Sequence, residues 1–205
     1  MRRGKASTWA EFGEDIGVLA GDALMIYAFE VAAKAFKEVS DADDLKRVGR
    51  AIEILASKTG IYGMIGGQTV DVELAGGPIP KNKLDFIYRL KTGALIEASM
   101  LIGAVLGGAA EEDCKIVESL AGKVGLAFQI QDDILDVTST EDELGKPIHS
   151  DEKNHKTTYV TLMGIEKASQ QVKKLSDEAV TLLEGLNKKN EFLFTLVNEL
   201  VGRRK

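Results

Sequence analysis

Apolar residues recur every three or four positions along most of the chain, which is the period of an α-helix with one packed face. Prolines, which interrupt such helices, occur only at Pro78, Pro80 and Pro147. The pattern predicts an all-α protein, and neither a repeat nor a shift in composition divides residues 1–205 into more than one domain. Helices are expected over residues 7–39, 41–59, 61–74, 82–102, 111–137, 157–186 and 190–202.

The expected helix over residues 7–39 contains Gly21, where we expect a break because glycine has a low helix propensity. Its apolar side chains are predicted to face the core: Leu19, Ala23, Ile26, Ala33 and Phe36. Ser40 and Asp41 are suited to cap the start of the next helix. The glycine- and proline-rich stretch at residues 76–80 is the clearest loop.

The helix expected over residues 111–137 is apolar on both sides, as in a helix buried within a bundle. Near its end, Asp132 and Asp136 lie one helical turn apart on one face, with Gln129 one turn earlier. Two carboxylates at this spacing repel each other unless a cation compensates, and they supply the oxygen ligands that Mg²⁺ prefers. An isolated motif of this kind is more often an N-cap or a solvated acidic turn. The apolar surroundings favour a metal site here.

Basic residues occur where a phosphate ligand would need them. Lys91 lies in the apolar stripe of the helix expected over 82–102, next to Thr92, so it either snorkels to water, pairs with an acid or serves a ligand as a cation. Lys146 and Lys156 lie in the polar segment after the acidic helix, and lysine is a point cation suited to phosphate. The alternative for this segment is a charged surface loop.

Composition and charge narrow the function classes. The chain is 44% hydrophobic and 28% charged, which is typical of a soluble globular protein. Its formal charge of -6 argues against binding to nucleic acid, and no run of about 18 apolar residues is present, so no membrane span is expected. Cys114 is the single cysteine, which excludes an internal disulfide and favours a cytoplasmic protein.

Eight stretches together resemble the polyprenyl synthetase family, the trans-prenyltransferases such as farnesyl and geranylgeranyl diphosphate synthases. In this order along the chain they are highly specific. They are RRGK at 2–5, FGE and LAGDAL within 12–24, GGQTVDVE at 66–73, KTGALIEAS at 91–99, GLAFQIQDDILDV at 125–137, ELGKP at 143–147 and HKTTYV at 155–160.

The resemblance implies a bundle of antiparallel helices of the isoprenoid synthase type and a role for each matching residue. It implies that Asp132, Asp133 and Asp136 hold Mg²⁺, that Lys91, Lys146 and Lys156 hold an allylic diphosphate, and that Thr92 and Gln129 lie close to the reacting carbon. Lys91, Thr92, Gln129 and Lys146 would be the catalytic residues. Arg3 would help to hold isopentenyl diphosphate, and Arg2 the allylic diphosphate.

The implied reaction joins isopentenyl diphosphate to dimethylallyl, geranyl or farnesyl diphosphate, and the implied assembly is a homodimer. In relatives a first aspartate-rich motif directly precedes the RRGK stretch, whereas this chain begins at Met1. We therefore expect an N-terminally truncated chain that is inactive or nearly so by itself.

Two other functions fit the same helical scaffold. One is a non-catalytic partner subunit or regulatory binder, against which the retention of the lysines and aspartates argues. The other is a terpene cyclase, which the KTG, QDD and GKP stretches resemble less closely than they resemble a chain-elongating synthase.

Overall fold

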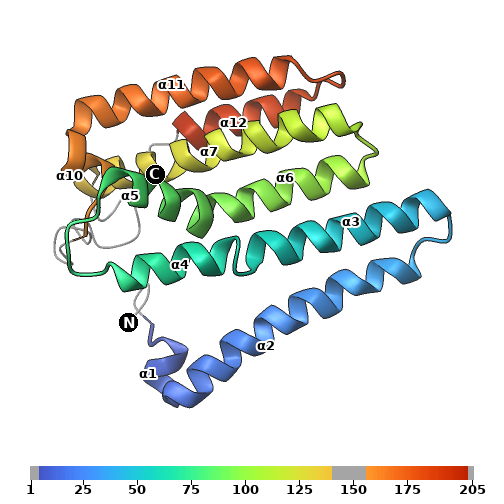
Figure 1. Ribbon diagram of the computed structural model, residues 1–205, viewed down its shortest axis with the longest axis horizontal. Helices are drawn as coiled ribbons and strands as arrows, with labels where there is room; N and C mark the ends of the chain where they lie inside the picture. The colour runs from blue at the N-terminus through green and yellow to red at the C-terminus, as the bar shows by residue number, and fades with distance from the viewer. Residues whose placement is uncertain (1–4, 140–155, 203–205) are drawn as a thin grey trace. The chain divides into compact units, whose positions relative to one another are not determined.

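The computed structural model describes residues 5–139 and 156–202, and these residues form helices and connecting turns without a β-strand. The all-α prediction is therefore confirmed. In chain order the helices are α1 (Thr8–Phe12), α2 (Glu14–Ala33), the 3₁₀-helix η1 (Lys34–Lys37), α3 (Ala42–Thr59), α4 (Met64–Glu73), α5 (Lys81–Ile87), the π-helix η2 (Tyr88–Gly93), α6 (Ala94–Leu106), α7 (Glu111–Thr138), α10 (Tyr159–Met163), α11 (Ile165–Glu184) and α12 (Glu191–Gly202) (Figure 1).

The chain contains two compact units, Met1–Ile52 and Glu53–Lys205, and the single domain expected over residues 1–205 stays a prediction. In the first unit the helix break falls at Gly13 and not at Gly21, which lies inside α2. Gly13 ends α1 with a φ of 91°, a backbone conformation that glycine adopts without steric cost. Asp41 caps α3 as predicted, because its Oδ1 accepts a hydrogen bond from the backbone N–H of Asp43 at 2.8 Å.

The surface of α2 is apolar and exposed. Leu19 is 60% exposed, and Ile26 and Phe36 are also exposed, so the prediction that these side chains face a core is wrong for the chain as it stands. None of the residues of α2 is buried. From Glu14 to Lys37 the helix is long and apolar enough, by length and composition alone, to cross a membrane, which corrects the expectation that no segment would qualify.

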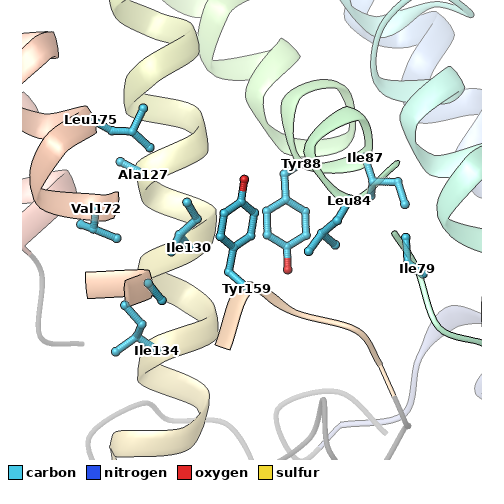
Figure 2. Packing of buried hydrophobic residues seen from close by; sticks show 11 residues of the cluster. Ile79, Leu84, Ile87, Tyr88, Ala127, Ile130, Ile134, Tyr159, Val172 and Leu175 are labelled. Carbon is cyan, nitrogen blue, oxygen red and sulfur yellow. The ribbon is translucent and has the colours of Figure 1, made fainter. Parts of the chain in front are cut away.

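The second unit is built around α7, which packs against α6, α11 and α12 (Figure 1). Its C-terminal half contributes Ala127, Ile130 and Ile134 to the largest apolar cluster, together with side chains from α5, η2, α10 and α11 (Figure 2). The helix expected over 111–137 is thus confirmed at Glu111–Thr138, with a buried surface on more than one side. A helix packed on several sides gives a firm support for the side chains near its end.

Lys58, close to the end of α3, joins three helices of this unit. Its Nζ lies 2.6 Å from an oxygen of Glu97 on α6 and 2.8 Å from an oxygen of Glu118 on α7. Glu97 is only 5% exposed, so this carboxylate depends on the ion pair to offset its loss of water.

Candidate functional site

The π-helix η2 lies between α4 and α7 at two points where only glycine fits. A Cβ at Gly67 of α4 would lie 2.4 Å from the backbone nitrogen of Lys91, and a Cβ at Gly125 of α7 would lie 2.8 Å from the Cα of Gly93. Backbones can approach this closely only where side chains are missing. Single-turn π segments within α-helices are frequent at functional sites, and this one lies between the two helices that carry the polar residues of the site.

Lys91 and Thr92 are neighbours in η2 but contact different helices. Lys91 Nζ lies 2.5 Å from Oδ2 of Asp71 on α4, and Thr92 Oγ1 lies 2.9 Å from Oε1 of Gln129 on α7. The structure thus brings Thr92 and Gln129 together, and their predicted place close to the reacting carbon stays a prediction. Lys91 has an acidic partner, which was one of the alternatives that the sequence left open.

Asp71 was not among the predicted site residues. It follows Gly67 by four positions, so both lie on the same face of α4. Because Gly67 contacts the backbone of η2, Asp71 is brought beside the same segment. In the sequence, the signal for this contact was Gly67 with Asp71 one turn later. A glycine lets another backbone approach this helix face, and an acid there can pair with a basic residue.

The three aspartates at the end of α7 differ in their surroundings. Asp132 is partly exposed, whereas Asp133 and Asp136 are each 2% exposed. Asp133 accepts hydrogen bonds from the hydroxyl of Tyr88, whose oxygen lies 2.9 and 2.7 Å from the two carboxylate oxygens, and from the backbone N–H of Tyr159 at 2.9 Å. Asp132 and Asp136 share a helix face, as the four-residue spacing predicted.

Tyr88 and Tyr159 form an aromatic pair beside Asp133. Their ring centroids are 5.6 Å apart, and Figure 2 shows the rings side by side with their hydroxyls at opposite ends. The Tyr159 hydroxyl donates to Asp85, whose carboxylate also receives Lys81 Nζ at 2.7 Å. Burial, reinforced by the negative charge of Asp85 and Asp133, raises the pKa of the Tyr159 hydroxyl, which keeps it protonated as a donor.

A cavity of about 150 Å³ lies beside the Lys91 partner. Asp71, Ile79, Lys156 and Thr157 are among the residues that line it. Thr157 Oγ1 accepts a hydrogen bond from the backbone N–H of Ile79 at 3.1 Å, which holds the segment around Lys156 against the loop that precedes α5. Lys156 thus borders the same cavity as Asp71, the acidic partner of Lys91. That the two lysines serve one anion stays a prediction.

Most predicted site residues are therefore brought to the same end of α7. Arg2, Arg3 and Lys146 lie outside the described residues. Within residues 5–139 and 156–202, no group of three or more histidine, cysteine, aspartate or glutamate side chains is arranged to hold a metal ion. Sequence reasoning missed Asp71, Tyr88, Asp85 and Tyr159, which contact the predicted residues directly.

The comparisons with known proteins all indicate the same protein family. The family described as polyprenyl synthetase matches residues 1–193. A heterodimeric geranylgeranyl pyrophosphate synthase large subunit from the chloroplast of Arabidopsis thaliana is 40% identical over 208 residues, covering 100% of this chain and 56% of that protein. Farnesyl diphosphate synthase of Escherichia coli strain K12 is 38% identical over 210 residues, covering 100% of this chain and 69% of that protein.

Solved structures agree. A geranyltransferase from Helicobacter pylori, crystallised with magnesium and isoprenyl diphosphate, superposes with a TM-score of 0.80 at 34% identity, covering 98% of this chain and 64% of that chain. A geranylgeranyl pyrophosphate synthetase from Pyrococcus horikoshii superposes with a TM-score of 0.84 at 27% identity, covering 99% and 72%. The chain spans about half to two thirds of the length of the curated relatives that it matches.

Proposed function

Since this chain belongs to the polyprenyl synthetase family, we propose that it serves a short-chain trans-prenyl diphosphate synthase activity, condensing isopentenyl diphosphate with dimethylallyl, geranyl or farnesyl diphosphate. One observation carries the proposal. The hydrogen bond from Thr92 to Gln129 at 2.9 Å joins η2, with Lys91, to α7 one turn before Asp132. The Lys91-bearing segment and the Thr92 hydroxyl are thereby joined to the aspartate-bearing end of α7. Such groups together can bind a diphosphate and its Mg²⁺.

The end of α7 fits Mg²⁺ by the chemistry of its donors. Asp132 and Asp136 present carboxylates one turn apart, and the described residues hold no larger group of ligands. Mg²⁺ is commonly bound by one or two carboxylates, with water and substrate phosphate oxygens completing its shell. When bound, the ion would stabilise the negative charge that develops on the departing diphosphate.

The remaining roles, binding the substrate and stabilising the carbocation, fall to side chains of this chain. Lys91 and Lys156 bind the allylic diphosphate, whose C–O bond breaks so that the diphosphate leaves with the electron pair. The double bond of isopentenyl diphosphate attacks the resulting carbocation, and a proton is then lost to the departing diphosphate. The Thr92 hydroxyl and the Gln129 carbonyl, held together at 2.9 Å, are positioned dipoles that stabilise the cation.

Asp71 holds Lys91 in place before a diphosphate arrives. The pair at 2.5 Å holds the Lys91 ammonium beside Asp71, which lines the same cavity as Lys156. A preorganised cation needs no rearrangement at the moment of reaction, so less of the binding energy is lost in ordering it.

The assembly proposed for this protein is a homodimer joined through α2. The exposed apolar side chains of α2 support this assignment, since monomeric soluble proteins seldom leave so many together in water. They are Ile16, Val18, Leu19, Leu24, Met25, Ile26, Tyr27 and Val31. The relative named as a heterodimeric large subunit is consistent with a protein–protein interface in this family.

The test is an assay, with Mg²⁺, geranyl diphosphate and labelled isopentenyl diphosphate, of the 205-residue chain beside a version extended upstream to include the first aspartate-rich motif of relatives. A labelled prenyl diphosphate product is expected from the extended version and little or none from the 205-residue chain. In the extended version Lys91→Met and Asp132→Asn should lower the rate by about 100-fold or more, because both remove charge stabilisation of the leaving group. Lys173→Met, which changes an exposed lysine on α11, is the matched control.

Other outcomes would favour other functions. Magnesium-dependent binding of geranyl diphosphate without turnover would support a non-catalytic subunit or regulatory binder. Release of hydrocarbons or alcohols would indicate a cyclase. Binding that neither Lys91→Met nor Asp132→Asn weakens would contradict the site assignment.

A further inference from the structure

We propose that Asp133 is a positioning residue, which fixes the two lysine-bearing segments against α7, and not a metal ligand. This inference rests on the proposed function and deepens it, because it assigns different roles to adjacent aspartates of one acidic stretch. It also departs from the resemblance, which would give Asp132, Asp133 and Asp136 the same role.

The first step is the direction of the side chain. Successive helical residues point about 100° apart, so Asp133 points about 100° away from the partly exposed Asp132 and about 60° away from the buried Asp136. It is 2% exposed and lies against the apolar cluster that contains Ile130, Tyr88 and Tyr159. The carboxylate therefore faces the interior of the second unit, where a charge persists only with hydrogen-bonding partners.

The second step is the nature of its partners. Both Asp133 oxygens lie within 2.9 Å of the Tyr88 hydroxyl, and Oδ2 also accepts the backbone N–H of Tyr159 at 2.9 Å. In Figure 2 the hydroxyl of Tyr88 lies at the end of its ring nearer the backbone of Tyr159, and both donors reach the same Asp133 oxygen, Oδ2. These donors engage both Asp133 oxygens, which leaves fewer lone pairs for a metal ion.

The third step concerns the lysines that lie close to these two tyrosines in the sequence. Tyr88 begins η2 and precedes Lys91 by three residues, while Tyr159 begins α10 and follows Lys156 by three residues. One buried carboxylate thus bridges two segments, one with Lys91, whose ammonium pairs with Asp71, and one with Lys156, which lines the cavity beside Asp71. Asp133 sets the separation of Lys91 and Lys156, and its effect on diphosphate binding acts through them.

The geometry is tested first without any ligand. Hydrogen exchange of the Tyr159 backbone amide is measured in the wild-type chain, in Asp133→Asn, in Tyr88→Phe and in Tyr62→Phe, an exposed tyrosine that serves as the matched control. Asp133→Asn should exchange about tenfold faster or more, since a neutral acceptor binds the N–H more weakly than a carboxylate. Tyr88→Phe should also raise the exchange rate of the Tyr159 amide, whereas Tyr62→Phe should leave this rate unchanged. Unchanged exchange in Asp133→Asn would overturn the bridge.

The functional consequence is tested by calorimetric titration with Mg²⁺ and inorganic pyrophosphate. At saturating Mg²⁺, Asp133→Asn and Tyr88→Phe should each weaken pyrophosphate binding by roughly tenfold, with the Mg²⁺ midpoint moving less than about twofold. Asp132→Asn, the ligand variant, should shift the Mg²⁺ midpoint by about tenfold or more. This division separates positioning from ligation, and Tyr88→Phe leaves every carboxylate intact.

Two results would overturn the proposal. One is a Mg²⁺ midpoint that moves as far in Asp133→Asn as in Asp132→Asn, and the other is a Tyr88→Phe variant that binds pyrophosphate like the wild type. If the wild-type chain binds no magnesium pyrophosphate, the proposed function fails, while the exchange measurement still decides whether Asp133 holds the two segments.

Discussion

At the residue scale, the ion pair of Lys58 is expected to contribute more to the free energy of unfolding than another lysine–carboxylate pair does. Its partner Glu97 is almost fully buried, whereas the Lys173–Asp177 pair on α11 is open to water. We expect Lys58→Met to lower the free energy of unfolding by about 2 kcal/mol, because a buried carboxylate loses its compensating charge. Lys173→Met should change it by less than about 0.5 kcal/mol. Urea unfolding of both variants measures the difference, and equal losses would contradict it.

The same lysine predicts a pH dependence. Burial alone would lower the pKa of Lys58, but hydrogen bonds to Glu118 and Glu97, with their charges, raise it above the ordinary value of 10.5. A lysine that holds its proton more tightly when folded contributes stability that is complete below about pH 10.5 and is lost as the pH rises through the folded pKa. Above about pH 10.5 the urea midpoint of the wild type should fall more steeply than that of Lys58→Met. Parallel curves would show that this pair does not control alkaline stability.

At the element scale, the contact of α4 with η2 predicts a sharp difference between two glycines. Gly67→Ala places a methyl group 2.4 Å from the backbone of Lys91, so we expect the unfolding free energy to drop by roughly 1–3 kcal/mol and diphosphate binding to weaken. Gly103→Ala, in α6 with open space around it, should instead stabilise the chain by about 0.5–1 kcal/mol. Thermal unfolding of the pair tests this, and similar losses in both variants would argue against the close approach.

Elements with strong, uninterrupted apolar patterns were predictable from the sequence, and breaks within them were less so. The bounds of α7 differ from the expectation by one residue, because a helix that is apolar on several sides leaves little ambiguity. The break at Gly13 was assigned to Gly21, since a propensity cannot show which glycine takes a positive φ. The π-helix η2 was hidden because the apolar pattern continues through residues 82–102.

The candidate site was predictable only in part. Asp132 and Asp136 follow from helical spacing, whereas the meeting of Thr92 and Gln129 depends on packing between segments 37 positions apart. Asp71 and Tyr159 were missed for the same reason, since their roles arise from partners on other helices. The sequence could not show that Asp132 is partly exposed and Asp133 buried, because the two neighbouring residues are identical.

At the scale of the whole molecule, α2 predicts self-association. Leu19→Lys together with Ile26→Lys places two charges on the exposed apolar surface, and we expect the mass in solution to change from a dimer to a monomer. Lys173→Glu, which alters charge at an exposed position of α11, should leave the dimer intact. Light scattering after size-exclusion chromatography measures both variants. A wild-type chain that is monomeric at every concentration would contradict the proposed homodimer.

The π-helix between α5 and α6 also constrains the number of residues in this part of the chain. An α-helix turns by about 100° per residue, so the additional residue accommodated by η2 sets the rotational phase between the buried faces of α5 and α6. Deleting a single residue there would turn either Leu84 or Ala98 away from its packed position. Insertions and deletions between these two residues should therefore be tolerated less well than substitutions, because they change the phase of one whole helix against the other.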